Sequence, residues 1–182
     1  MTKLKIPVSS EDHIQGAETA EVTLVEYGDY ECSHCAQAYP VIKRVQQHFG
    51  KRIRFVFRNF PLTESHPNAE AAAETAEFAG AHGKFWEMHD LLYENQPRLS
   101  GALLLELARK LRLTPAALSQ ALEDGQFTVH VRADFSGGVR SGVNGTPTFF
   151  INGFRHDGAF DFADLVQAID EAIGTTSSSA RG

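Results

Sequence analysis

The sequence predicts an α/β fold in which a series of helices interrupts a sheet, and three observations support this. The first is a strand–helix–strand pattern over residues 22–59. The second is a run of helical patterns over about residues 64–140, and the third is a strand–turn–strand signal followed by a helix after residue 147. Strands that alternate with helices are typical of α/β domains, so the sheet is expected to form from both ends of the chain.

The first strand–helix–strand unit begins with a short β-rich run at residues 22–27, which is apolar on both faces. That pattern predicts a buried central strand. Apolar residues recur at helical spacing from Cys35 to Phe49, and Gly50 is suited to end that helix. Residues 52–59 predict a second strand, and a right-handed crossover would make the two strands parallel.

The middle of the chain predicts helices at residues 68–81, 84–93, 100–111, 115–124 and 126–135. Ser100 and Thr114 are candidate N-caps, and Pro115 suits a first helical position. Gly125 lies beyond the end of its helix, and the pair Gly137–Gly138 follows the last one.

Sheet signals return near the C-terminus. Residues 148–151 and 154–156 flank Asn152–Gly153, which predicts a β-hairpin with a type I′ turn. Asp161 is expected to cap a last helix that extends to about residue 173. This order is that of a thioredoxin fold with an inserted helical subdomain. We therefore expect a single domain over residues 1–182, an insertion at about 64–140 and a flexible tail at about 175–182.

Composition limits the function classes. The chain has 182 residues and a net charge of −6, which argues against a surface built to bind nucleic acid. No apolar run approaches the roughly 20 residues that span a membrane. Both cysteines lie in one motif, Cys32-Ser33-His34-Cys35, which points to chemistry at one place rather than to a disulfide-stapled scaffold.

The two cysteines lie where a strand ends and a helix begins. The thiolate is the nucleophile in disulfide exchange, and the unpaired N–H groups of a helix N-terminus stabilise it. Cys32 is expected to attack and Cys35, with two residues between them, to resolve the mixed disulfide. The alternative is half of a zinc site, which would need remote ligands because the sequence has no second C-x-x-C.

Two neighbours of this motif are candidates for tuning it. His34, when protonated, would lower the pKa of the Cys32 thiol, whereas Glu31 and Asp29 would act in the opposite direction. Glu26 interrupts an apolar strand six residues before Cys32 and could accept or return a proton during exchange. The alternatives are a surface histidine and a strand-end glutamate that faces solvent.

Thr146–Pro147 precedes an apolar strand, where a proline cannot donate to the ladder. In the context of the C-x-x-C motif we expect a cis bond here, close to the cysteines, with backbone that pairs with an extended substrate segment. His66, His82 and His89 are expected to be cap or surface residues rather than metal ligands.

Five stretches of the chain resemble, in order, those of DsbA-like thioredoxin-domain proteins. They are Val22–Cys35, Phe60–Leu62, His66–Ala69, Gly83–Asp90 and Gly142–Gly153. The resemblance covers about residues 6–173 and implies a thioredoxin fold with an inserted helical subdomain.

The resemblance also implies roles for single residues. Cys32 matches the attacking thiol and Cys35 the resolving thiol, Glu26 the buried acid and Pro147 the cis-proline. His34 matches the histidine of the Cys-Pro-His-Cys motif. Ser33 departs from that motif, where proline is common, and this leaves the oxidising strength open.

The family implies an enzyme that exchanges disulfides with protein or peptide thiols and disulfides, and that a redox partner recycles. No cofactor is expected beyond the Cys32–Cys35 disulfide, and no metal. Two alternatives remain: a glutathione-dependent isomerase or transferase on the same fold, and a non-enzymatic zinc-binding or chaperone-like module. The N-terminus has no apolar segment of a secretory signal, so we expect a cytoplasmic location, or a periplasmic one if a signal was removed.

Overall fold

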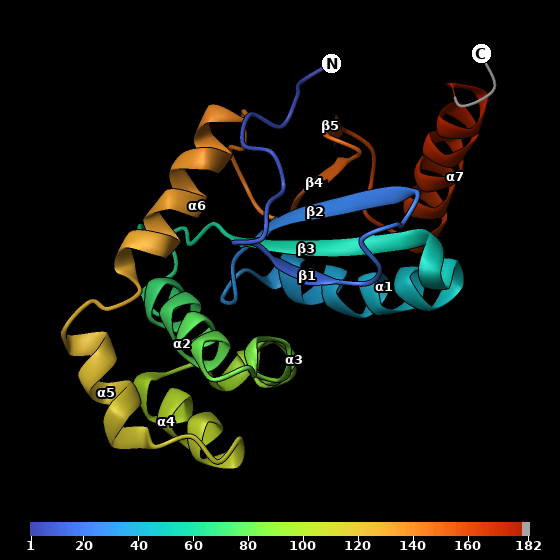
Figure 1. The fold of residues 1–182 in the computed structure, drawn as a ribbon. Coiled ribbons are helices and arrows are strands. Elements are labelled where there is room, and N and C mark those ends of the chain that lie inside the picture. Colours follow the sequence, from blue (N-terminus) through green and yellow to red (C-terminus); the bar gives the residue numbers. More distant parts are fainter. Residues whose placement is uncertain (180–182) are drawn as a thin grey trace. The chain divides into compact units, whose positions relative to one another are not determined.

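The computed structural model describes residues 1–179, with side chains through residue 175. The chain divides into two compact units. The first comprises Met1–Tyr27, Gln37–Arg58 and the part from Gly137 onward, and the second comprises Gly28–Ala36 and Asn59–Ser136. Figure 1 shows that the first unit holds the sheet and the second most of the helices.

The described strands form one sheet in the order β1–β3–β2–β4–β5 (Figure 1). They are β1 (His13–Gln15), β2 (Val22–Gly28), β3 (Ile53–Asn59), β4 (Thr148–Ile151) and β5 (Phe154–His156). Strand β4 is antiparallel to both β2 and β5, and β1 is antiparallel to β3. Every residue of β2 except Thr23 is buried, which confirms the central strand predicted from its two apolar faces.

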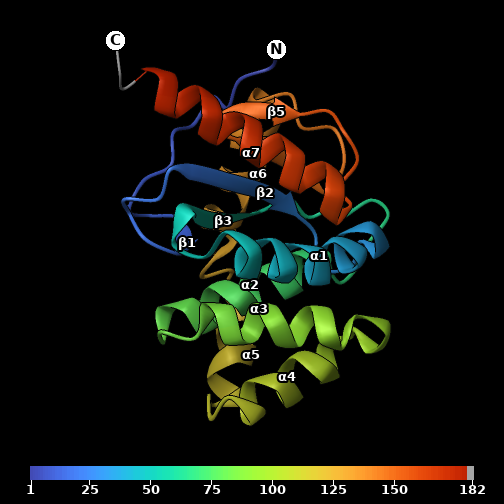
Figure 2. The same cartoon turned by 90° about the vertical axis from the view of Figure 1, so that its right-hand side faces the viewer.

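Helix α1 (Ser33–Phe49) connects β2 to β3, and helix α7 (Phe162–Ser179) follows β5. The predicted apolar stripe of α1 is buried at Ala38, Ile42, Val45 and Phe49. The guanidinium of Arg44 lies 4.3 Å from the ring centroid of Phe162, at the start of α7. Figure 2 shows both helices on the same side of the sheet, so they bury one face of its strands.

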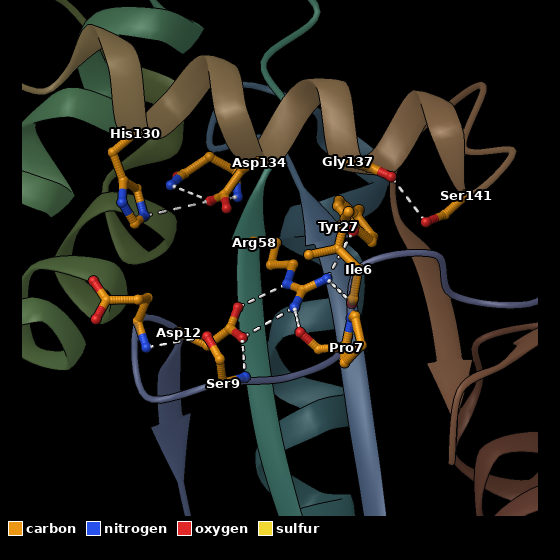
Figure 3. A network of polar contacts seen from close by, with 12 residues as sticks. Ile6, Pro7, Ser9, Asp12, Tyr27, Arg58, His130, Asp134, Gly137 and Ser141 are labelled. Carbon is orange, nitrogen blue, oxygen red and sulfur yellow. Dashed lines mark hydrogen bonds and ion pairs between the residues drawn. The ribbon is translucent and has the colours of Figure 1, made fainter.

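Strand β1 was not predicted, because three residues are too few to show an alternating pattern. The segment that leads into it is fixed by Arg58 of β3 (Figure 3). This guanidinium donates hydrogen bonds to both carboxylate oxygens of Asp12, at 2.7 and 3.0 Å. It also donates to the carbonyl oxygens of Ile6 and Pro7 and to the Tyr27 hydroxyl. Because both charged side chains are buried, the pair holds the N-terminal segment in place.

The second unit contains the helices predicted for the middle of the chain. They are α2 (Ala69–Ala81), α3 (Phe85–Glu94), α4 (Gly101–Lys110), α5 (Pro115–Glu123) and most of α6 (Thr128–Arg140). Ser100 caps α4 as predicted, since its hydroxyl accepts the N–H of Leu103 at 3.2 Å. Thr114 occupies the N-cap position of α5 and Pro115 begins the helix, as predicted, although the Thr114 side chain makes no cap hydrogen bond.

Helix α6 continues through Gly137–Gly138 to Arg140, whereas the sequence predicted its end near residue 135. At Gly137 a Cβ atom would lie 3.1 Å from Cγ1 of Ile6, so this position favours a residue without a side chain. Gly137 therefore allows Ile6 of the same unit to lie close to the helix, and it does not mark the helix end. The Ser141 hydroxyl donates to the Gly137 carbonyl oxygen and closes the last turn (Figure 3).

The C-terminal elements follow the prediction closely. Asn152 and Gly153 have φ values of 47° and 82°, as a type I′ turn requires. The Asp161 carboxylate accepts the N–H of Asp164 at 3.1 Å and caps α7. This helix extends to Ser179, beyond the expected end near residue 173. Residues 180–182 of the expected flexible tail lie outside the described residues.

Candidate active site

Cys32 lies directly before the first residue of α1, and Cys35 lies in its first turn. The two residues are 3.9 Å apart. Cys35 is fully buried, whereas Cys32 is 6% exposed. The Cys32 N–H donates to the carbonyl oxygen of Asp29, and the Cys32 carbonyl oxygen accepts the N–H of Ala36. The pair thus occupies the helix N-terminus, where unpaired N–H groups and the helix dipole favour a thiolate.

His34 and Ser33 lie between the cysteines, and both are exposed. Their exposure follows from helical geometry, because residues one and two positions after Cys32 lie away from the stripe that joins Cys32 to Cys35. His34 is therefore placed at the surface next to the cysteine pair. A role for it in tuning the thiol remains a prediction.

The loop before Cys32 is held by two carboxylates. The buried side chain of Asp29 accepts the backbone N–H groups of Glu31 and Leu62 at 2.7 and 2.8 Å. Its Oδ2 atom also lies 2.7 Å from Nδ1 of His66. The Glu31 carboxylate accepts two hydrogen bonds from Asn68, one from the backbone and one from the side chain, at 2.7 and 2.9 Å. Both acids are thus engaged with partners from the segment 62–68.

An aromatic cluster lies beneath this loop. The Tyr30 hydroxyl is hydrogen-bonded to Nδ1 of His89 at 3.0 Å, and Tyr93 packs against both rings. The side-chain amide of Gln96 donates to the carbonyl oxygens of Tyr30 and Cys32, at 2.8 and 2.9 Å. His89 is buried, so the expectation of a cap or surface role was wrong for this residue. Sequence reasoning did not identify Gln96, because nothing local marks an amide that bonds to a loop 64 residues earlier.

Glu26, Thr146 and Pro147 belong to the first unit, whereas the cysteines belong to the second. Glu26 lies in β2, is 3% exposed and stands opposite Phe149 of β4 in the sheet register. It is therefore a buried acid and not a strand-end glutamate that faces solvent. The Thr146–Pro147 peptide bond is cis, and Pro147 directly precedes β4. The Thr148 hydroxyl donates to the carbonyl oxygen of Gly145 at 2.8 Å and tightens this turn.

A second polar cluster of the helical unit was not predicted. The Asn59 amide donates to the carboxylates of Glu77 and Asp134, at 2.7 and 3.1 Å. Nε2 of His130 lies 3.6 Å from the Glu77 carboxylate. The same atom lies 3.8 Å from the Asp134 carboxylate (Figure 3). Burial raises the pKa of Asp134 to about 6, because hydrogen bonds from Asn59 and the His130 charge only partly offset the loss of solvation.

Comparison with known sequences identifies relatives of two kinds. The chain matches the thioredoxin family over residues 9–171. Two curated relatives are Na⁺/H⁺ antiporters: NhaA 1 of Salinispora arenicola, 44% identical over 174 residues, and NhaA 3 of Salinispora tropica, 40% identical over 179 residues. These matches cover 95% and 98% of this chain but 26% and 27% of the antiporters. The chain thus spans about a quarter of the length of the curated relatives it matches.

Solved structures with a similar fold come from several bacteria. BdbD from Bacillus subtilis superposes with a TM-score of 0.81 at 24% identity, over 88% of this chain and 92% of that one. The α-DsbA1 protein of Wolbachia pipientis gives 0.84 at 20% identity, over 97% and 98%. A thioredoxin-like oxidoreductase from Silicibacter pomeroyi DSS-3 gives 0.77 at 26% identity, over 90% and 93%. These likenesses confirm the predicted thioredoxin fold with a helical insertion.

Proposed function

Because the chain belongs to the thioredoxin family, as a DsbA-like domain, we propose that it is a thiol:disulfide oxidoreductase acting through Cys32 and Cys35. The observation that carries this proposal is the placement of the two cysteines 3.9 Å apart at the N-terminus of α1. Disulfide formation requires the two sulfur atoms to come within about 2.05 Å of each other. The substrates are peptide or protein thiols and disulfides.

The reaction proceeds in two exchange steps. The Cys32 thiolate attacks one sulfur of a substrate disulfide, so that a Cys32–substrate bond forms and the second substrate sulfur leaves as a thiolate. The Cys35 thiolate then attacks the Cys32 sulfur, and the first substrate sulfur leaves. The substrate gains two electrons and, after protonation, two protons, and the enzyme holds a Cys32–Cys35 disulfide. The reverse sequence oxidises a substrate dithiol.

The exposure of the two cysteines supports this division of roles. Cys32 is 6% exposed and Cys35 is fully buried, so an incoming disulfide has access to Cys32 first. His34 would stabilise the Cys32 thiolate when protonated. Glu26 would take up or return a proton, and the backbone at Thr146 and Pro147 would pair with an extended substrate segment. The recycling partner is a further thiol or disulfide protein of unassigned identity.

Mass spectrometry and an exchange assay together test the proposal. The purified protein should differ by two hydrogens with and without reductant, and it should catalyse exchange between glutathione and a disulfide-containing peptide. The Cys32→Ser variant should be inactive, and His82→Asn, changed far from the motif in sequence, should match the unchanged chain. Exchange that survives without Cys32 would contradict the proposal. A stoichiometric zinc content without exchange would favour the zinc-binding alternative.

The curated relatives suggest a second, compatible role. Identity to the antiporters reaches 44% over 95% of this chain, well above the 17–26% found for the similar solved structures. We propose that this domain works beside a membrane transporter of the Na⁺/H⁺ antiporter class. Among the described residues, no helix is both long and apolar enough to cross a bilayer. Cross-linking of membranes from the source cells, read by mass spectrometry, should join this chain to such a transporter. The absence of these cross-links would contradict the role.

A further inference from the structure

His66 is held against the loop that carries Cys32. Its Nδ1 atom lies 2.7 Å from Oδ2 of Asp29, and the imidazole remains 24% exposed. The side chain of Asp29 is fully buried. A buried carboxylate needs partners, and here it has two backbone N–H groups and the imidazole. The hydrogen bond fixes a proton on Nδ1 and leaves Nε2 as the atom that titrates.

Asp29 connects this histidine to the cysteine motif through the backbone. Its carbonyl oxygen accepts the N–H of Cys32, so one residue orients both the histidine and the start of α1. The His66 backbone contributes as well, because its N–H donates to the carbonyl oxygen of Leu62 and its carbonyl oxygen accepts the N–H of Ala69, at the start of α2. His66 is therefore held in place by hydrogen bonds of both its backbone and its side chain.

The charged groups that act on His66 are Asp29, Glu31 and Cys32, all from the loop before α1. Burial lowers the pKa of His66, but the hydrogen bond and charge of Asp29, with the charges of Cys32 and Glu31, outweigh it, so the pKa is raised. An electrostatic interaction is reciprocal: if the Cys32 thiolate stabilises the imidazolium, the imidazolium stabilises the thiolate. Glu31 opposes this effect less than its charge suggests, since Asn68 donates two hydrogen bonds to its carboxylate.

We propose that the Asp29–His66 pair is a positioning device whose imidazolium stabilises the thiolate of Cys32 and so sets the pH dependence of disulfide exchange. This inference rests on the proposed function and adds a histidine outside the C-x-x-C motif to it. In the exchange step His66 neither gains nor loses a covalent bond. It favours the state in which Cys32 carries the negative charge, as attacking thiolate or as leaving group. The effect is present below the pKa of His66 and is lost as pH rises through it.

The decisive variant is His66→Asn, because the asparagine amide reproduces the N–H donor of Nδ1 to Asp29 and cannot carry a positive charge. The apparent pKa of the Cys32 thiol can be measured directly. The reduced protein is alkylated over a series of pH values, and the modification of Cys32 is followed by mass spectrometry. We expect the apparent pKa of the Cys32 thiol to rise by roughly one unit. The equilibrium constant against glutathione should then shift about tenfold toward the disulfide form of the enzyme, equivalent to about 30 mV.

Two further variants separate charge from structure. His66→Lys restores a positive charge and should recover most of the thiol acidity. His82→Asn is a matched control, because His82 is also hydrogen-bonded through Nδ1, to the Phe78 carbonyl oxygen at the end of α2. It should leave the alkylation profile of Cys32 unchanged. If His66→Asn and His82→Asn both leave the profile unchanged, the inference is wrong.

A reciprocal measurement avoids any change at His66. The imidazole titration of His66, followed by NMR in reduced protein and in Cys32→Ser, should give a lower pKa in the variant because the thiolate charge is gone. Equal values in the two proteins would overturn the inference, whether or not His66→Asn folds. Neither alkylation nor NMR requires catalytic exchange. A protein that shows the coupling but no exchange would contradict the proposed function alone, and exchange without the coupling would contradict this inference alone.

Discussion

The side-chain amide of Gln96 donates a hydrogen bond to the backbone carbonyl oxygen of Cys32 at 2.9 Å, across 64 residues of sequence. A second bond, to the carbonyl oxygen of Tyr30, fixes the same loop. The amide group thus supports the backbone of the attacking cysteine from the 3₁₀ turn η2 (Gln96–Arg98).

We predict that Gln96→Ala lowers the free energy of unfolding by about 1–2 kcal/mol, since two carbonyl groups lose a hydrogen-bond partner. Urea unfolding under fixed redox conditions measures this. Gln120→Ala is the control, because the Gln120 amide bonds to the exposed side chain of Asp124 within α5 and its C-cap. That change should stay within about 0.5 kcal/mol. Equal effects of the two variants would show that the loop does not depend on Gln96.

The two cysteines should behave unequally toward substrates. Cys35→Ser should accumulate mixed disulfides, because Cys32 still attacks and the thiol that resolves the intermediate is missing. Cys32→Ser should form none. Non-reducing electrophoresis and mass spectrometry of the adducts make the comparison. Full turnover by the Cys35→Ser variant would reverse the assignment of roles.

The reduction potential of the Cys32–Cys35 pair should fall between those of thioredoxin and DsbA, roughly −270 to −120 mV. The helix N-terminus and a protonated His34 would favour the reduced thiolate, and Glu31 and Asp29 would oppose it. Ser33 stands where the Cys-Pro-His-Cys motif that the sequence resembles has proline. Equilibration against a series of glutathione ratios gives the value. A potential at the DsbA limit would favour an oxidase over a reductase or an isomerase.

The buried pair of Arg58 and Asp12 should matter far more for stability than an exposed pair on the same unit. Arg58→Met leaves the Asp12 carboxylate buried without its cation, and we expect a loss of about 3–5 kcal/mol. Arg52→Met removes an ion pair with Glu21 whose side chains are 50% and 40% exposed, and should cost about 1 kcal/mol or less. Thermal or urea unfolding at neutral pH compares them. Similar losses would contradict the role given to Arg58.

Asp134 should make stability depend on pH. Its pKa is raised to about 6 in the folded protein, above the value of about 3.9 for an unfolded chain. The folded state therefore binds more protons between pH 4 and 6, so the contribution of this group to stability falls as pH rises through that window. Asp134→Asn, which keeps an oxygen that can accept from Asn59, should stabilise the protein at pH 7 by about 1–3 kcal/mol and flatten the pH profile. A variant that is less stable at pH 7 but equal at pH 4 would contradict this.

The sequence by itself determined the features that depend on neighbouring residues. The two apolar faces of β2, the stripe of α1, the Ser100 and Asp161 caps and the turn at Asn152 each follow from local patterns. The position of the cysteine pair at a helix N-terminus also followed, because a strand end and a helix start are both readable within a few residues.

Tertiary structure alone decided which distant side chains meet. Strand β1 pairs with β3, and Gly137 lies within α6 at a point where Ile6 leaves little room for a side chain. The contact of His66 with Asp29 joins residues 37 apart in sequence, and no periodic pattern encodes it. Helix and strand patterns report interactions over a few residues, whereas the charges and hydrogen bonds that act on Cys32 come from segments that packing brings together.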